Sequence, residues 1–331
     1  MSIDSIWGKF RRKSAAPITT VVLDADGTAL DPSHKITEPV ACAIRDARAA
    51  GLRVIVATGR ARAGPWVGNV LEPMDLLAPG VFLQGLTAFD EQGTRIHDEF
   101  VEPEVVAAAE AACAGDDTLT LCAYVREILV SPVSNRATNR YCEYEEAQCE
   151  LPEPWLDSSN ERDSWCISEA LSASHATRTA PGVSKLLVLH SRNAKDAVRL
   201  RRRLEVALDG RARVVQAVDW TLEILPPKSS KAAGVRVLLE SLGVDPAEVM
   251  AVGDGENDLE LLRMVGHPVA MGNAVDKLKR VARGNIVGSN AQDGVAQALR
   301  EIAIPNSRST ADFFCALIER VEASNRGSSK L

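Results

Sequence analysis

The strongest constraint on the fold is a buried-strand pattern at residues 19–23 (TTVVL), which ends directly in the polar segment DADGT. Apolar and β-branched residues on both faces are typical of a central strand in a parallel sheet. Shorter runs of the same kind occupy residues 54–57, 80–83 and 249–252, and helical patterns lie between them, of which Thr37 can cap the first. The sequence therefore predicts an α/β protein with a Rossmann-like parallel sheet and right-handed crossovers.

The alternation of strands and helices stops after residues 84–85 and resumes at a helix that Ser230 can cap. The intervening residues carry the patterns of a hairpin, a strand at 185–190, a helix at 194–208 and two further strands. Because this segment is not needed to build the parallel sheet, we expect it to form an inserted α/β cap domain. The predicted parts are a flexible N-terminus (1–16), a core domain (17–87 and 226–304), a cap (88–225) and a C-terminal tail (305–331).

Composition limits the partners that such a chain can have. Its 331 residues correspond to roughly two domains, and its net charge is −7. An acidic chain is not a general binder of polyanions, so we expect no nucleic-acid partner. No apolar stretch is long enough to span a bilayer, so we expect no membrane association. We expect a monomer or a weak dimer.

Cysteine usage and the N-terminal segment bear on location. The 7 cysteines are irregularly spaced and form no C-x-x-C pair, which favours a reducing compartment over a disulfide framework or a zinc site. Residues 1–16 lack the apolar segment of a secretory signal, although residues 8–14 (GKFRRKS) are basic. We interpret them as a frayed terminus rather than a targeting segment. The expected location is the cytoplasm, and the alternative is the plastid.

Polar side chains follow three of the predicted strands. They are Asp24 and Asp26, Thr58, and Asp254 and Asp258. The carboxyl ends of parallel strands form the site edge of such a sheet, so these groups can converge. Carboxylates that lie this close favour a cation between them, and Mg²⁺ suits oxygen ligands. One carboxylate as nucleophile and a second as acid and base can transfer a phosphoryl group, although an isolated D-x-D is more often a turn.

Four motifs in this order resemble those of the haloacid dehalogenase (HAD) superfamily. They are DADGT at 24–28, ATGR at 57–60, Lys231, and GDGEND at 253–258. The insert between the second and third motifs is similar in position to the type 2 cap of the Cof-type phosphatases. Residues 79–93 and 222–233 look most like the HAD module that plant plastid proteins carry fused to an rRNA-processing endoribonuclease. No stretch of this chain resembles that endoribonuclease.

The resemblance implies a role for each matching residue. Asp24 would attack phosphorus, and Asp26 would protonate the leaving oxygen and then activate water. The groups that would bind the phosphoryl oxygens or neutralise their charge are Thr58, the amide of Gly59, Lys231 and Asn257. The groups that would hold Mg²⁺ are Asp24, the Asp26 carbonyl and Asp254. Asp258 would contact these ligands without binding the ion directly.

The family implies a Mg²⁺-dependent phosphatase, a phosphoric monoester hydrolase acting on a small phosphorylated metabolite. A sugar phosphate, flavin mononucleotide and pyridoxal phosphate are all open as substrates. A phosphomutase of the same fold is an alternative, as is a regulatory module that binds a partner in plastid or ribosome biology.

Two residues close to the motifs each have two interpretations. Arg60 could contact the substrate or pair with a local acid, and Lys228 is more often a solvated lysine than part of the site mouth.

Overall fold

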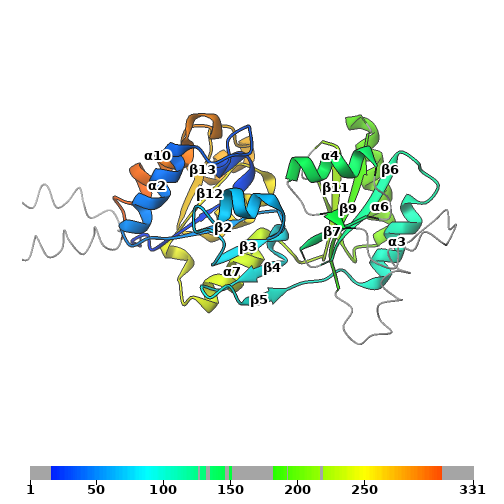
Figure 1. Ribbon diagram of the computed structural model, residues 1–331, viewed down its shortest axis with the longest axis horizontal. Coiled ribbons are helices and arrows are strands. Elements are labelled where there is room, and N and C mark those ends of the chain that lie inside the picture. The colour runs from blue at the N-terminus through cyan, green and yellow to red at the C-terminus, as the bar shows by residue number, and fades with distance from the viewer. Residues whose placement is uncertain are drawn as a thin grey trace, which may run out of the picture.

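Two β-sheets organise the protein (Figure 1). The computed structural model describes residues 16–125, 127–131, 135–145, 149–150, 182–191, 193–216 and 219–307. One sheet belongs to the core domain and the other to the cap, as the sequence predicts. The predicted N-terminal segment, apart from residue 16, lies outside the described residues, and so does the tail beyond residue 307.

The core sheet has seven strands in the order β13-β12-β1-β2-β3-β4-β5. The first five of these are parallel to one another, and β1 pairs with β12 on one side and β2 on the other. The strands are β1 (Thr20–Leu23), β2 (Arg53–Ala57), β3 (Gly80–Phe82), β4 (Thr87–Phe89), β5 (Arg95–Asp98), β12 (Val249–Gly253) and β13 (His267–Ala270).

Helices cover both faces of the core sheet, with α2 and α10 on one side and α7 on the other (Figure 1). Thr37 caps α2 and Ser230 caps α7, each accepting a backbone hydrogen bond in the first turn. The predicted starts of these two helices are therefore confirmed. The core helices are α2 (Glu38–Ala49), α7 (Lys231–Ser241), α8 (Leu259–Met264), α9 (Asp276–Val281) and α10 (Gly294–Gln297).

The strand order reverses between β1 and β12. From β1 the chain crosses through α2 to β2, whereas from β12 it crosses through α8 to β13 on the opposite side. Such a reversal opens a crevice at the carboxyl ends of the two central strands. Asp24 follows β1 and Asp254 follows β12, so both carboxylates lie at this crevice.

The core domain extends further along the chain than the sequence predicts. β4 pairs with β3 and β5 pairs with β4, both antiparallel, so residues 88–98 complete the core sheet. The predicted boundary between residues 87 and 88 is therefore wrong, because it falls inside β4. An antiparallel meander continues a sheet without a helix, so the end of the strand–helix alternation did not mark the end of the domain. The second predicted boundary, at residues 225–226, lies between the last cap strand and α7.

The cap sheet has six strands in the order β10-β11-β9-β6-β7-β8 and is largely antiparallel. The predicted hairpin is present as β6 and β7. The cap strands are β6 (Leu119–Val125), β7 (Ile128–Val130), β8 (Cys149–Glu150), β9 (Val183–His190), β10 (Arg213–Val215) and β11 (Thr221–Leu225). The cap helices are α3 (Pro103–Cys113), α4 (Arg136–Glu145) and α6 (Ala194–Leu208).

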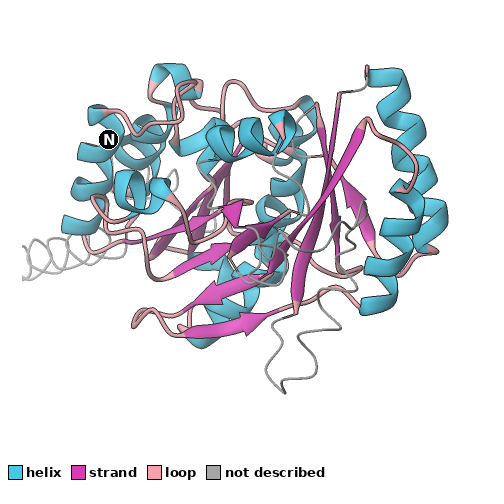
Figure 2. Cartoon of the chain, turned by 45° about the vertical axis from the view of Figure 1, so that its right-hand side comes forward, coloured by secondary structure: helices cyan, strands magenta, loops and turns pink. Residues whose placement is uncertain are grey.

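The two faces of the cap sheet have different neighbours. Leu186 and Val188 of β9 pack with α3 and α6, which cover the outer face (Figure 2). Leu187 alternates with them and packs in a cluster that includes Leu83 and Leu86 of the core. The inner face of the cap is therefore held against the core next to the crevice. Among the described residues, no helix is both long enough and apolar enough to cross a membrane.

Candidate active site

Lys231 joins two aspartates at the crevice. Its ammonium nitrogen Nζ lies 2.6 Å from Oδ1 of Asp24 and 2.6 Å from Oδ1 of Asp258. All three side chains are buried, with exposed fractions of 0% for Lys231, 7% for Asp24 and 0% for Asp258. The two carboxylates raise the pKa of Lys231 although burial opposes the shift, so the lysine is charged at neutral pH. A fixed positive charge is thus placed beside Asp24.

Asp258 fixes the loop that carries Asp254. Its second oxygen, Oδ2, accepts hydrogen bonds from the backbone amides of Asp254 (3.1 Å) and Gly255 (3.0 Å). Both carboxylate oxygens of Asp258 are therefore occupied by protein donors. Asp258 also does not line the cavity in front of the core sheet, whereas Asp24 and Asp254 both do.

Asp254 lies close to the turn after β1. Thr28 donates a hydrogen bond to its Oδ1 at 3.1 Å, and Asn273 donates to its Oδ2 at 3.3 Å. Gly27 has a φ of 75°, and a Cβ atom there would lie 2.3 Å from Oδ2 of Asp254. The glycine therefore allows both the left-handed turn and the close approach of Asp254.

One oxygen each of Asp24, Asp254 and Asp258 lies within 4.8 Å of the others, and Asp24 and Asp254 are the two of these that line the cavity and can hold a metal ion there. Burial raises the pKa of Asp24 well above its usual range, because Lys231 offsets the burial only in part and Asp258 and Asp254 add to it. Burial, together with the charge of Asp258, likewise raises the pKa of Asp254 to about 6. All of these ligands are carboxylate oxygens, and their raised pKa values show that nearby positive charge is needed to keep them ionised. Such a site fits a hard divalent cation such as Mg²⁺.

Asp26 is engaged by a cation on the neighbouring strand. Arg60, which follows β2, donates from Nε to Oδ2 of Asp26 at 2.8 Å and from Nη2 to Oδ1 at 2.7 Å. Nδ1 of His34 lies 3.1 Å from the same Oδ1. Burial would raise the pKa of Asp26, but the hydrogen bonds from Arg60 and His34 outweigh it and lower the pKa to about 2. Of the two interpretations of Arg60, this structure shows the pairing with a local acid.

Thr58 and Gly59 form a tight loop at the end of β2. Oγ1 of Thr58 accepts a hydrogen bond from the Arg60 amide at 3.1 Å, which leaves the hydroxyl hydrogen available to donate. Gln84 packs against Gly59, where a Cβ atom would lie 2.6 Å from Nε2 of the glutamine. Asn257 donates a hydrogen bond to Oε1 of Gln84 at 3.1 Å, so the second and fourth motifs meet through this glutamine.

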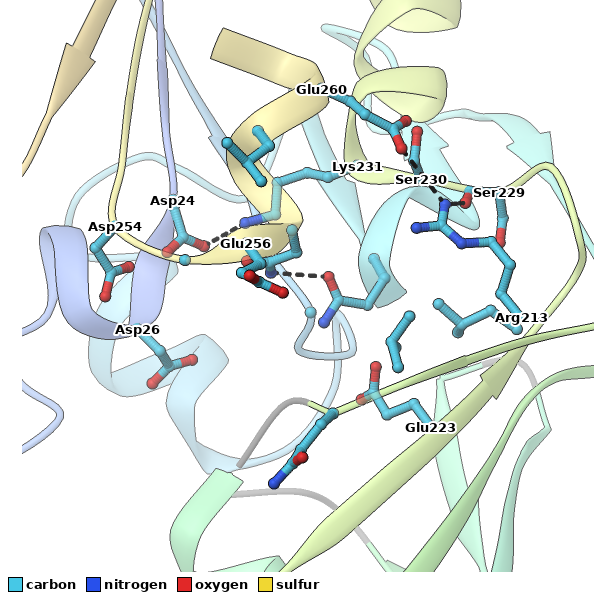
Figure 3. Close-up of a pocket in the computed structure, with 18 of the residues that line it drawn as sticks. Asp24, Asp26, Arg213, Glu223, Ser229, Ser230, Lys231, Asp254, Glu256 and Glu260 are labelled. Carbon is cyan, nitrogen blue, oxygen red and sulfur yellow. Dashed lines mark hydrogen bonds and ion pairs between the residues drawn. The ribbon is translucent and has the colours of Figure 1, made fainter. Parts of the chain in front are cut away.

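A cavity of about 750 Å³ lies between the core and the cap. Figure 3 shows Asp24, Asp26 and Asp254 at one end of it and Arg213, Ser229 and Glu260 at the other. Arg213 of the cap donates to the Ser229 carbonyl at 2.6 Å and lies 3.7 Å from Glu260, so the cap contacts the core at this rim. Lys228 is exposed and is not among the residues that line the cavity.

The structure brings all the predicted site residues to this one edge of the core sheet. Sequence reasoning assigned no role to several polar residues that complete it: His34, Gln84, Asn273 and, in the cap, Lys185 and Glu223. Gln84 carried a signal, because it stands beside a glycine at a predicted strand end, where the structure now shows a φ of 62°. The others carried none, because their contacts depend on pairing between distant segments.

The profile of a family described as haloacid dehalogenase-like hydrolase matches residues 21–299. This match covers both parts of the core sheet as well as the cap. The chain therefore belongs to this family, as the four motifs indicate.

Three relatives show the extent of the similarity. "Endoribonuclease YBEY, chloroplastic" of Arabidopsis thaliana is 32% identical over 293 residues, which are 86% of this chain and 46% of the plant protein. This chain thus spans less than half of that relative. "5-Amino-6-(5-phospho-D-ribitylamino)uracil phosphatase YwtE" of Bacillus subtilis is 24% identical over 85% of this chain and 97% of its own length. A haloacid dehalogenase-like hydrolase of Bacteroides thetaiotaomicron shares the fold, with a TM-score of 0.69 and 23% identity over 86% of this chain and 99% of that structure.

Proposed function

We propose that the protein is a Mg²⁺-dependent phosphatase that hydrolyses a small phosphate monoester through an aspartyl phosphate on Asp24. The observation that carries this proposal is the buried contact between Lys231 and Asp24 beside Asp254. The name of the Bacillus relative, a phosphatase of a ribitylamino compound, supports the same class of reaction. The cavity in front of Asp24 has room for a metabolite rather than for a macromolecule.

In the first half of the reaction, an oxygen of Asp24 attacks phosphorus and the bond between phosphorus and the ester oxygen breaks. The ester oxygen leaves as an alcohol after taking a proton from Asp26. Lys231 keeps Asp24 oriented and offsets the negative charge that gathers on the phosphoryl oxygens. The Thr58 hydroxyl and the Gly59 amide can donate hydrogen bonds to the same oxygens.

In the second half, water attacks phosphorus and Asp26 takes its proton, so the bond to Asp24 breaks and inorganic phosphate leaves. A pKa of about 2 leaves Asp26 ionised at neutral pH, so in this arrangement it can accept a proton but holds none to donate in the first step. We infer that the phosphoryl group draws Arg60 away from Asp26 before the leaving group departs. Loss of that cation would let the pKa of Asp26 rise toward the value that a general acid needs.

Mg²⁺ would be held by the carboxylates of Asp24 and Asp254 and by the carbonyl oxygen of Asp26. When bound, it would supply positive charge to the phosphoryl oxygens and to the attacking carboxylate. Asp258 would hold the loop and Lys231 in place rather than bind the ion, because its side chain is fully buried and does not line the cavity.

The test is release of inorganic phosphate from a panel of small phosphate monoesters with Mg²⁺ present. The panel includes sugar and polyol phosphates, flavin mononucleotide, pyridoxal phosphate and p-nitrophenyl phosphate. We expect turnover by the natural protein and none by Asp24→Asn, since an amide cannot form the acyl phosphate. Activity of Asp24→Asn within tenfold of the natural protein would contradict the role of Asp24. Transfer of the phosphoryl group within a sugar, without phosphate release, would favour the phosphomutase.

A further inference from the structure

One buried ion pair of the cap connects the inner face of the cap sheet to the Thr58–Gly59 loop at the end of β2. Nζ of Lys185, on β9, lies 2.6 Å from Oε1 of Glu223, on β11, and donates to the carbonyl of Gly59 at 3.1 Å. The side chains of Lys185 and Glu223 are only 1% and 3% exposed. The strand alternation that places Leu187 toward the core also places Lys185 and Glu223 there.

The second carboxylate oxygen of this pair has no partner. Oε2 of Glu223 is buried and makes no hydrogen bond within the part of the chain that the structure describes. Leaving a buried acceptor unsatisfied costs free energy, so native proteins rarely keep one without a reason. Glu223 also lines the cavity that contains Asp24, and Figure 3 shows its carboxylate directed toward that cavity.

We propose that Oε2 of Glu223 accepts a hydrogen bond from a hydroxyl group of the leaving alcohol and so selects polyhydroxylated phosphate esters. This inference rests on the proposed phosphatase function and adds a specificity-determining residue to it. The hydroxyl would lie near the ester, because Glu223 is separated from the Gly59 loop by a single ammonium group.

The charge balance favours a hydroxyl over a charged donor. Lys185 already neutralises the Glu223 carboxylate, so an ammonium group on the substrate would add an uncompensated positive charge to a buried site. A carboxylate on the substrate would face Oε2 of Glu223, which can accept a hydrogen bond but cannot donate one. Val215 and Leu225 line the same wall of the cavity and can contact the carbon atoms of a sugar or polyol.

The experiment compares kcat/KM for hydroxylated and hydroxyl-free alkyl esters. The hydroxylated probes are ribitol 5-phosphate, glucose 6-phosphate and glycerol 3-phosphate, and the hydroxyl-free probe is butyl phosphate. In Glu223→Gln the charged carboxylate acceptor becomes an amide, whose hydrogen bond with a hydroxyl group is neutral and about half as strong. The ratio of kcat/KM for the best hydroxylated probe to kcat/KM for butyl phosphate should therefore fall by about tenfold.

Glu127→Gln is the matched control. Glu127 also joins the cap to the core, through an ion pair of 2.9 Å with Arg95, but it does not line the cavity. The same change of charge at this position should leave the substrate ratio unchanged. A ratio that falls equally in both variants would show a general effect of cap contacts and would overturn the proposal.

Two measurements separate this proposal from the proposed function. If the natural protein hydrolyses butyl phosphate as well as it does the best hydroxylated probe, the selection by Glu223 is wrong and the phosphatase stands. If it hydrolyses no ester, both fail. Should Glu223→Gln unfold because Lys185 loses its counter-charge, Lys185→Met/Glu223→Gln removes the pair together and must show the same loss of selectivity.

Discussion

Arg60 holds Asp26 through two hydrogen bonds of 2.8 Å and 2.7 Å, although the two residues stand at the ends of neighbouring strands and are 34 positions apart. The side chain of Arg60 is 1% exposed, whereas that of Asp26 is 31% exposed. In this arrangement the residue proposed to move protons is fully ionised. We propose that the pair couples the binding of the phosphoryl group, which would attract Arg60, to the protonation of Asp26.

The pair predicts a specific dependence of stability on pH. The pKa of Asp26 falls from 3.8 to about 2 on folding, so its contribution is complete above pH 4 and is lost as the pH drops toward 2. After allowance for solvent screening, the contribution is about 1–2 kcal/mol. The free energy of unfolding in urea should therefore decline more steeply between pH 4.5 and 2.5 for the natural protein than for Asp26→Asn. Parallel profiles would contradict the low pKa.

Lys231 is expected to matter for both stability and turnover. Lys231→Met would leave Asp24 and Asp258 buried without their cation, which should cost about 3–5 kcal/mol of unfolding free energy. Turnover should fall by about a thousandfold or more, since charge on the transferred group is no longer offset. Denaturant unfolding and phosphate release measure the two effects.

A double variant separates these effects of Lys231. Lys231→Met/Asp258→Asn removes one of the two stranded carboxylates, so it should regain part of the lost stability but none of the lost activity. Recovery of turnover in the double variant would show that Lys231 acts only as a structural counter-charge.

The local pattern of the sequence was sufficient to predict the strands and helices that position the site. The carboxylates after β1 and β12 follow from buried-strand patterns, and the helix starts follow from the capping residues Thr37 and Ser230. These features depend on neighbouring residues along the chain, which is why they can be predicted without a structure. The four motifs then placed the predicted nucleophile beside the predicted lysine.

Features that depend on pairing between segments could not be predicted in the same way. β4 and β5 extend the core sheet because β4 pairs with the edge of β3 and β5 pairs with β4. The alternation of strands and helices along the sequence does not show which strand edge a segment joins. The pairing of Lys185 with Glu223 likewise requires the register of β9 against β11. In the sequence, these two residues are a lysine and a glutamate 38 positions apart with no common motif.

Metal binding should be measurable without turnover. Mg²⁺ should raise the thermal unfolding midpoint of the natural protein, because it binds the folded acidic group and not the unfolded chain. Asp254→Asn should remove most of this shift, since it replaces one of the two carboxylates that line the cavity and would hold the ion. Calorimetric scans with and without EDTA provide the measurement. An equal shift in the variant would place the ion elsewhere.

The same ion should be required for activity. We expect EDTA to abolish phosphate release and Mg²⁺ to restore it. Ca²⁺ should not restore it, because a larger and less regular coordination shell would misplace the attacking carboxylate. Full turnover after exhaustive chelation would count against the proposed metal site as a whole.

The two halves of the reaction should separate in Asp26→Asn. p-Nitrophenolate is a stable anion and leaves without a proton, so Asp24 can still be phosphorylated when Asp26 is replaced. The second half needs a base to activate water, so hydrolysis of the aspartyl phosphate should slow by about a hundredfold or more. Stopped-flow absorbance should then show a burst of about one p-nitrophenolate per active site before slow turnover. Asp24→Asn should show no burst, and steady turnover of Asp26→Asn at the natural rate, with no burst, would remove Asp26 from the mechanism.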